Sequence, residues 1–256
     1  MSDLPLIVIP ARLHSTRLPD KVLADIAGRP MIQRVWEAAQ AARAGRVLIA
    51  TDHERIAAVA RAFGAECIMT RDDHASGSDR IAEVADQLGL ADEQMIVNLQ
   101  GDEPEMPAAC LDQVARLLDE NADADVSTLF WPIEEASELI DPSAVKLVTD
   151  DRGRALYFSR AAIPHVRGAK DAPAALGSGQ AFKRHLGLYA YRVSALRAFT
   201  AAEPATLELS EGLEQLRFLA MGRSIVVARA AEAIPPGIDT PEDLARVRES
   251  FSRKYS

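Results

Sequence analysis

Short apolar runs alternate with longer amphipathic stretches through the first half of the chain. The runs are rich in β-branched residues, as strands are, whereas the longer stretches repeat their apolar positions about every three to four residues, as helices do. The predicted strands cover residues 4–10, 46–50, 66–69 and 94–99, and the predicted helices cover 31–44, 54–63 and 78–88. Strands and helices that alternate in this way are typical of a parallel sheet with helices on both faces. The pattern therefore predicts a doubly wound α/β fold.

The alternation loosens after about Pro132, where we expect mixed strands separated by loops that contain Gly and Pro. Further strands are predicted at 144–149, 155–158 and 184–192. Residues 167–180 are rich in Gly and Ala without periodicity, which predicts a mobile loop, either a lid or a plain connection. Near the end of the chain, a predicted strand at 224–229 precedes Thr240 and Pro241, which together with the acids that follow are typical of a helix start.

Composition narrows the class of protein. The 256 residues, 48% of them hydrophobic, can bury one sizeable core. The net charge of −9 argues against a surface that binds nucleic acid or anionic membrane non-specifically. The chain has no apolar stretch of the roughly 20 residues that a membrane helix needs, and its start lacks the basic residues of a signal peptide. Cys67 and Cys110 show no redox or metal-ligand spacing. We therefore expect a cytoplasmic protein with reduced cysteines and no membrane insertion.

A basic loop, residues 10–21, follows the first predicted strand. It carries three cations and two hydroxyls, namely Arg12, Arg17, Lys21, Ser15 and Thr16. Loops at the carboxyl ends of strands bind the ligands of open α/β sheets, and this set of groups suits a triphosphate better than solvated surface charge. The loop has neither the G-x-G-x-x-G pattern of dinucleotide-binding folds nor the G-x-x-x-x-G-K-[ST] pattern of P-loops. This argues against both a P-loop enzyme and an NAD-dependent oxidoreductase.

An acidic turn follows the predicted strand at 94–99. The sequence Q-G-D-E-P at 100–104 places Asp102 at the same edge of the sheet as the basic loop, and Gly101 allows the chain to turn close to a ligand. Mg²⁺ binds one or two carboxylates and phosphate oxygens, so Asp102 and one further carboxylate would suffice. A plain turn residue is the alternative for Asp102. Paired carboxylates would also suit a glycosidase, but only 5% of the residues are aromatic, too few to stack on sugars.

The motif P-A-R-x-x-S-T-R-L-P-x-K at 10–21, followed by G-x-P-M-I at 28–32, closely resembles the 3-deoxy-D-manno-octulosonate (Kdo) cytidylyltransferases. The resemblance extends over nearly the whole chain. It includes A-T-D at 50–52, T-R at 70–71, His74, S-G at 76–77, Asn98, Q-G-D-E-P at 100–104, Y-F-S-R at 157–160, I-P at 163–164, R-H-L-G at 184–187, L-E-Q-L-R at 213–217 and D-T-P-E-D-L at 239–244. Together these motifs are highly specific.

The resemblance implies a mostly parallel, mixed sheet of the nucleotide-diphospho-sugar transferase type. It implies an enzyme that transfers CMP from CTP to the anomeric hydroxyl of Kdo, releases pyrophosphate and so activates the sugar for lipopolysaccharide biosynthesis, with Mg²⁺ as cofactor and a homodimer as the assembly. Residues 1–256 would form one domain. Within it, 1–131 would mainly bind CTP, 132–223 would mainly bind the sugar acid and dimerise, and 224–256 would return a strand and a helix to the core.

The resemblance also implies the site residues. Those expected to act in catalysis are Arg12, Lys21, Asp102 and Asp239, and the last two would hold the metal. Those expected to bind CTP are Pro10, Ala11, Arg12, Ser15, Thr16, Arg17, Lys21, Arg71, Ser76, Gly77 and Gln100. Those expected to bind the sugar acid are Gln100, Arg160, His185, Tyr189, Glu211 and Gln215.

Local structure offers alternative roles for some of these residues. Ser76 is equally a cap for the helix predicted after it, and Asp239 is equally an acid beside the Thr240 cap. Strand alternation places His185 and Tyr189 on one face, where they could line a site or pack in the core.

A predicted helix carries three further polar residues. Glu211, Glu214 and Gln215 are spaced three and four residues apart, so on one helix they would share a face, which could equally be a solvent-exposed one.

One residue departs from the family pattern, and the acceptor stays open. The family commonly has Gly where this chain has Asp20, which tolerates a left-handed backbone but would weaken nucleotide binding unless it points outward. An 8-amino analogue of Kdo, or sialic acid, is the alternative acceptor. A non-catalytic nucleotide-binding subunit is a remote alternative, since such a protein would be expected to lose the carboxylates that Asp102 and Asp239 provide.

Overall fold

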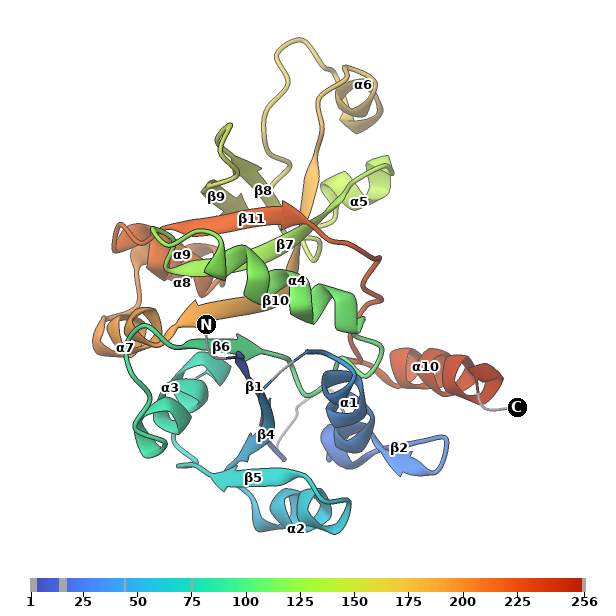
Figure 1. The fold of residues 1–256 in the computed structure, drawn as a ribbon. Helices are drawn as coiled ribbons and strands as arrows, with labels where there is room; N and C mark the ends of the chain where they lie inside the picture. The colour runs from blue at the N-terminus through green and yellow to red at the C-terminus, as the bar shows by residue number, and fades with distance from the viewer. Residues whose placement is uncertain (1–3, 14–17, 44, 75, 255–256) are drawn as a thin grey trace.

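The computed structural model describes residues 4–13, 18–43, 45–74 and 76–254 (Figure 1). The strands are β1 (Leu6–Ala11), β2 (Asp25–Ile26), β3 (Arg29–Pro30), β4 (Arg46–Thr51), β5 (Glu66–Met69), β6 (Met95–Asn98), β7 (Val126–Pro132), β8 (Lys146–Thr149), β9 (Ala155–Ser159), β10 (Lys183–Arg192) and β11 (Ile225–Arg229). The helices are η1 (Lys21–Leu23, a 3-10 turn), α1 (Met31–Gln40), α2 (Glu54–Ala62), α3 (Gly77–Gln87), α4 (Ala108–Asp119), α5 (Ala136–Ile140), α6 (Ala172–Leu176), α7 (Val193–Ala201), α8 (Thr206–Glu211), α9 (Gln215–Ala220) and α10 (Pro241–Lys254).

Nine of the described strands form one sheet. Its central order is β11-β7-β10-β6-β1-β4-β5, and β8 and β9 extend it beside β10. Strands β6, β1, β4 and β5 are parallel neighbours, whereas β10 runs antiparallel to both β6 and β7. The sheet is therefore mostly parallel with mixed strands, as the sequence predicts. Because β1, β4 and β6 are parallel, their carboxyl ends share one edge.

Helices cover both faces of the sheet (Figure 1). On one face, buried side chains of β1 such as Ile7 and Ile9 pack with α1, α2, α4 and α10. On the other face, Leu6 and Val8 pack with α3, α7 and α9. Alternate residues of one strand thus enter opposite cores, because successive side chains in a strand point to opposite faces. This arrangement confirms the doubly wound fold.

The sequence analysis expects no membrane insertion. Within the described part of the chain, no helix combines the length and apolarity needed to cross a bilayer.

Two parts of the fold differ from the sequence expectation. Residues 167–180 contain the short helix α6, which begins where the Asp171 carboxylate accepts the Ala174 amide at 2.9 Å. A capping acid, Pro173 at the helix start and a run of alanines explain why a helix forms there. The sequence pattern also missed α4 and β7, although both are buried elements beside the central strands.

Candidate functional site

The loop after β6 lies directly against the end of β1. A Cβ atom on Gly101 would approach the Pro10 carbonyl oxygen to 2.9 Å, so this close approach needs glycine. From the opposite side, the Ile238 amide donates to the Asp102 carbonyl at 2.9 Å. Segments around residues 10, 102 and 238 therefore meet at the carboxyl edge of the sheet, where open α/β folds bind their ligands.

Lys21 links two carboxylates that are far apart in the sequence. Its Nζ lies 2.6 Å from Asp102 Oδ2 and 3.1 Å from Asp239 Oδ1. The Lys21 side chain is only 12% exposed, whereas the two carboxylates are 30% and 49% exposed. An ammonium held between two carboxylates marks a point of negative potential that favours a cation. Three of the four residues expected in catalysis thus lie together.

The two carboxylates fit the way in which proteins hold Mg²⁺. Among the described residues, no group of three or more His, Cys, Asp or Glu side chains is placed to hold a metal ion. A metal between Asp102 and Asp239 would therefore take its remaining ligands from phosphate oxygens and water, which is the usual arrangement for Mg²⁺ at nucleotide sites. The donor set suits magnesium, and its binding stays a prediction.

Part of the basic loop lies outside the described residues. Ser15, Thr16 and Arg17 belong to this part. Pro10 and Ala11 are buried in β1, and Arg12, which follows them, is exposed. The described part of the loop therefore supplies Lys21 and Arg12 as the cations nearest the strand end.

Asp20 adopts a left-handed conformation, which glycine takes most readily. Its φ is 53° and its ψ is 27°, and Asp is among the residues that tolerate this region. Its Oδ2 lies 3.2 Å from Arg55 Nη1 on α2. Since both side chains are about half exposed, this ion pair contributes little stability. The contact does show that the Asp20 carboxylate is directed toward α2.

The residues expected to read the base lie at the start of α3. The Ser76 hydroxyl accepts the Asp79 amide at 3.1 Å and the Asp79 carboxylate accepts the Ser76 amide at 3.0 Å, which is a capping box. The cap role of Ser76 is thus confirmed, whereas its contact with a base stays a prediction. A Cβ on Gly77 would lie 3.6 Å from Pro10 and 3.9 Å from Gln100, so these three residues are neighbours.

Arg71 makes its contacts with two acidic residues outside that group. Its guanidinium pairs with Asp73 at 3.0 Å, and both side chains are exposed. Its backbone amide donates to Glu83 at 3.0 Å. The ion pair uses only Nε of Arg71 and is exposed, so it is no obstacle to a base contact by this side chain.

His185 and Tyr189 share one face of β10, as strand alternation predicts. Their ring centroids are 5.3 Å apart, and the Phe158 ring lies 5.1 Å from His185 on the other side. Burial lowers the pKa of His185 to about 3, because the charged imidazolium would lose its hydration. His185 is therefore neutral at neutral pH and does not supply the cation that a sugar carboxylate needs.

Arg160 and Glu211 are bound to each other. The Glu211 carboxylate accepts the Arg160 amide at 2.9 Å and the Ser159 hydroxyl at 2.6 Å, and these hydrogen bonds lower its pKa. The Arg160 side chain donates in turn to the carbonyl oxygens of Glu211 and Pro142 at 2.7 and 2.9 Å. Arg160 thus links the end of β9 to the end of α8 through the Glu211 carboxylate and carbonyl oxygens.

The expectation of one helix for Glu211, Glu214 and Gln215 is wrong. Helix α8 ends at Glu211 because Gly212 takes a φ of 63°, and α9 begins only at Gln215. The Glu214 carboxylate accepts the Ser78 hydroxyl at 2.8 Å, which joins α9 to the start of α3. Gln215 is buried. The three side chains therefore lie on two elements with different partners.

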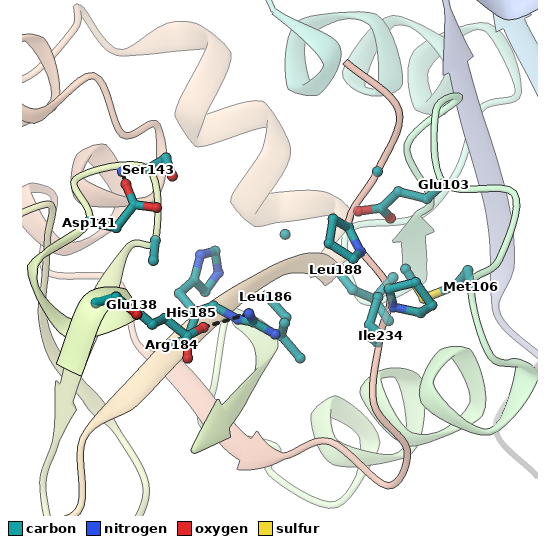
Figure 2. A pocket seen from close by; sticks show the side chains of 16 residues that line it. Glu103, Met106, Glu138, Asp141, Ser143, Arg184, His185, Leu186, Leu188 and Ile234 are labelled. Atoms are coloured by element: carbon teal, nitrogen blue, oxygen red, sulfur yellow. Dashed lines mark hydrogen bonds and ion pairs between the residues drawn. The ribbon is translucent and has the colours of Figure 1, made fainter. Parts of the chain in front are cut away.

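A cavity of about 520 Å³ is lined by His185 and by Glu103, a residue to which the sequence analysis assigned no role (Figure 2). Glu103 and His185 lie on opposite sides of it, and an Arg184–Glu138 ion pair of 2.6 Å forms part of its wall. Oε2 of Glu103 is buried without a hydrogen-bond partner among the described residues. Burial and the adjacent Asp102 raise the pKa of Glu103 to about 8. The position of Glu103 directly after Asp102 was the sequence feature that could have identified it as a site residue.

Comparisons with known sequences show the family of this chain. The sequence model of the family described as cytidylyltransferase matches residues 6–225. A 3-deoxy-manno-octulosonate cytidylyltransferase from Pseudomonas syringae pv. syringae is 53% identical over 246 residues, which cover 94% of this chain and 96% of the relative. One of the same name from Pseudomonas fluorescens is 51% identical over 249 residues, covering 97% and 98%.

Comparisons with solved structures confirm the fold class. A structure of CMP:2-keto-3-deoxy-manno-octonic acid synthetase complexed with CTP is 38% identical with a TM-score of 0.89, and the match covers 98% of this chain and all of that one. A cytidylyltransferase from Leptospira borgpetersenii serovar Hardjo-bovis is 13% identical with a TM-score of 0.57, covering 100% and 96%. The second likeness is one of fold alone.

Proposed function

Because the chain belongs to the cytidylyltransferase family, we propose that it transfers CMP from CTP to the anomeric hydroxyl of Kdo and releases pyrophosphate. The observation that carries this proposal is the convergence of Lys21, Asp102 and Asp239 at the carboxyl edge of the sheet. Relatives that are 51–53% identical over nearly the whole chain bear the name of this activity. The product would activate the sugar for lipopolysaccharide biosynthesis.

The basic loop binds the triphosphate. Arg12, Arg17 and Lys21 neutralise phosphate charge, while Ser15, Thr16 and the backbone at Pro10 and Ala11 donate or shape the contacts. Lys21 is held by two carboxylates at 2.6 and 3.1 Å, so its ammonium is already directed to the point where the end of β1, the loop after β6 and the segment before α10 approach one another. The base binds beside Gly77 and Gln100, with Ser76 and Arg71 at its rim.

Asp102 and Asp239 would hold Mg²⁺, which would supply neutralisation of phosphate charge and polarisation of the reacting groups. The backbone hydrogen bond from Ile238 to Asp102 and the capping box of Thr240 and Asp243 at the start of α10 fix the backbone beside the two carboxylates.

The sugar acid binds on the β10 side of the two carboxylates. Gln100, His185, Tyr189 and Gln215 supply hydrogen bonds, and Arg160, with Glu211 fixing it, supplies positive charge near the carboxylate of the sugar. The anomeric oxygen attacks the α-phosphorus in line as the bond to the β-phosphate oxygen breaks. Catalysis is mainly positioning and electrostatic stabilisation of the charged transition state.

Pyrophosphate release with CTP and Mg²⁺ tests this function. Kdo, its 8-amino analogue and sialic acid are compared as acceptors in separate reactions. A reaction without any acceptor gives the background. We expect release that depends on Kdo, and a mass spectrum that contains CMP-Kdo. Pyrophosphate release with sialic acid but not with Kdo would show that sialic acid is the acceptor. If none of the three acceptors gave release above the background, the proposal would be overturned.

We further propose a cytoplasmic homodimer. Strand β9 lies at an edge of the described sheet and pairs only with β8 there, and Ser159 at its end contacts Glu211 at the end of α8. Leu156 on β9 and Leu207 and Leu209 on α8 are exposed. An edge strand beside exposed leucines is the kind of surface that a second copy covers.

The free thiols Cys67 and Cys110, and CTP as the substrate, favour the cytoplasm.

A further inference from the structure

Thr128 contacts three groups at a bulge between β7 and β10. Leu186 of β10 pairs with Leu129, but Thr128 pairs with Tyr189, so Gly187 and Leu188 are additional residues in β10. Oγ1 of Thr128 lies 3.1 Å from the Leu186 carbonyl oxygen and 2.9 Å from the Leu188 carbonyl oxygen. It also lies 3.1 Å from Nε2 of His185. Thr128 itself is fully buried.

The proton count at this hydroxyl determines the tautomer of His185. A hydroxyl has one proton to donate and two lone pairs that accept. The two carbonyl oxygens can only accept, so the Thr128 proton is directed to one of them. Nε2 of His185 must then donate to Thr128 Oγ1. Since burial lowers the pKa of His185 to about 3, the ring is neutral and carries its only N–H proton on Nε2.

The other ring nitrogen is left as an acceptor. In the neutral Nε2–H tautomer, Nδ1 has a lone pair and no proton. Among the described residues no hydrogen bond to His185 Nδ1 is formed, and Nδ1 is not one of the buried atoms without a partner. His185 lines the cavity of about 520 Å³, opposite Glu103 (Figure 2). The lone pair is therefore open to a ligand in that cavity.

We propose that Thr128 is a positioning residue that fixes His185 as a hydrogen-bond acceptor, and that His185 Nδ1 accepts the proton of a hydroxyl group of the sugar acid. A lone pair repels a carboxylate, so His185 recognises a hydroxyl and the carboxylate of the sugar binds elsewhere. The part that concerns the sugar rests on the proposed function, whereas the tautomer does not.

Long-range ¹H–¹⁵N correlation spectra of the ¹⁵N-histidine-labelled protein test the tautomer without any substrate. His185→Gln assigns the signals. We expect a protonated Nε2 and an unprotonated Nδ1 in the wild type, unchanged between about pH 6 and pH 8. Thr128→Ser should keep this pattern, and Thr128→Val should lose it because Val cannot accept from Nε2. A wild-type spectrum with the proton on Nδ1 would overturn the proposal whether or not the chain makes CMP-Kdo.

Steady-state kinetics test the effect on the sugar acid. Thr128→Val should raise the KM for Kdo about 10-fold, with kcat and the KM for CTP within about twofold of the wild type, as expected for the loss of one hydrogen bond. Thr128→Ser should restore the wild-type KM. Ser127→Ala is the matched control, because Ser127 is equally buried but donates to the Val114 carbonyl on the other face. Equal KM changes in Thr128→Val and Ser127→Ala would mean that Thr128 acts only through stability, and would contradict the proposal.

Discussion

Lys21 is separated from its two partners by 81 and 218 residues of sequence. Removal of its ammonium would take away the cation that Asp102 and Asp239 share, which destabilises the folded state. We predict that Lys21→Met lowers the free energy of unfolding by about 1 kcal/mol, a modest cost because both carboxylates are partly exposed. Mg²⁺ without nucleotide should then raise its melting temperature more than that of the wild type.

Thermal unfolding with and without Mg²⁺ measures this difference. Arg46→Met is a suitable control, because Arg46 forms an exposed ion pair with Glu66 that lies outside the site. Its response to Mg²⁺ should equal that of the wild type. If Mg²⁺ shifts all three proteins equally, Asp102 and Asp239 do not form a cation site.

His185 makes the free energy of unfolding fall as the pH falls. Its pKa is about 3 in the folded protein and about 6.5 when unfolded, so the unfolded chain binds the proton more tightly. The stabilisation is present above about pH 6.5 and is lost as the pH falls toward 3. Since the exposed fraction of His185 is intermediate, solvent screens part of this effect, and we predict a loss of about 1 to 2 kcal/mol between pH 7.5 and pH 5.

Urea unfolding of the wild type and His185→Gln at these two pH values checks the prediction. The variant lacks the titrating group, so its loss of stability over the interval should be smaller by that amount. Parallel losses in the two proteins would show that His185 does not stay neutral in the folded state.

Gly101 matters at the scale of elements, because it lets the loop after β6 lie against β1. A Cβ there would meet the Pro10 carbonyl oxygen at 2.9 Å and push Asp102 away from Lys21. We predict that Gly101→Ala keeps the fold but lowers kcat/KM at least about 10-fold, since small displacements of positioned groups are costly. Gly177→Ala at the end of α6 is the control, with a Cβ contact of 3.4 Å and no expected effect on turnover. Equal kcat/KM values in the two variants would contradict this role.

The sequence predicts elements best where one local signal decides them. Strand and helix positions around the central parallel strands agree to within a few residues, and the Ser76 cap follows from its own side chain. Gly212 shows where local patterns stop being sufficient. The polar spacing of residues 211–215 fits one helix, but the φ of 63° at Gly212 ends α8, so the segment belongs to two helices. The pattern also failed for α6, whose cap and alanines outweigh the adjacent glycines.

The contacts within the site join residues that are far apart in the sequence, and the sequence alone does not show that they meet. The resemblance identified Lys21, Asp102 and Asp239, but their meeting results from the register of β1 and β6 and from the return of the chain before α10. Thr128 had no signal, because its role arises from a bulge in another strand. Ser15, Thr16 and Arg17 lie outside the described residues, so their roles stay predictions.

At the scale of the whole molecule, the proposed homodimer depends on the surface formed by β9 and α8. Leu156→Lys with Leu209→Lys would place two charges where a second copy should bury apolar side chains. We predict that light scattering after size exclusion shows a dimer for the wild type and a monomer for this double variant. Leu4→Lys changes an equally exposed leucine elsewhere and should stay dimeric. A wild-type monomer would contradict the proposal.

The central claim is that two convergent carboxylates support cytidylyl transfer, and CMP-Kdo formation by Asp102→Asn and Asp239→Asn tests it most directly. With CTP, Mg²⁺ and Kdo, both variants should lose at least about 100-fold in kcat/KM while they unfold cooperatively like the wild type. Glu242→Gln, an exposed acid at the start of α10, should keep wild-type turnover. Near-normal CMP-Kdo formation by Asp102→Asn would contradict the account.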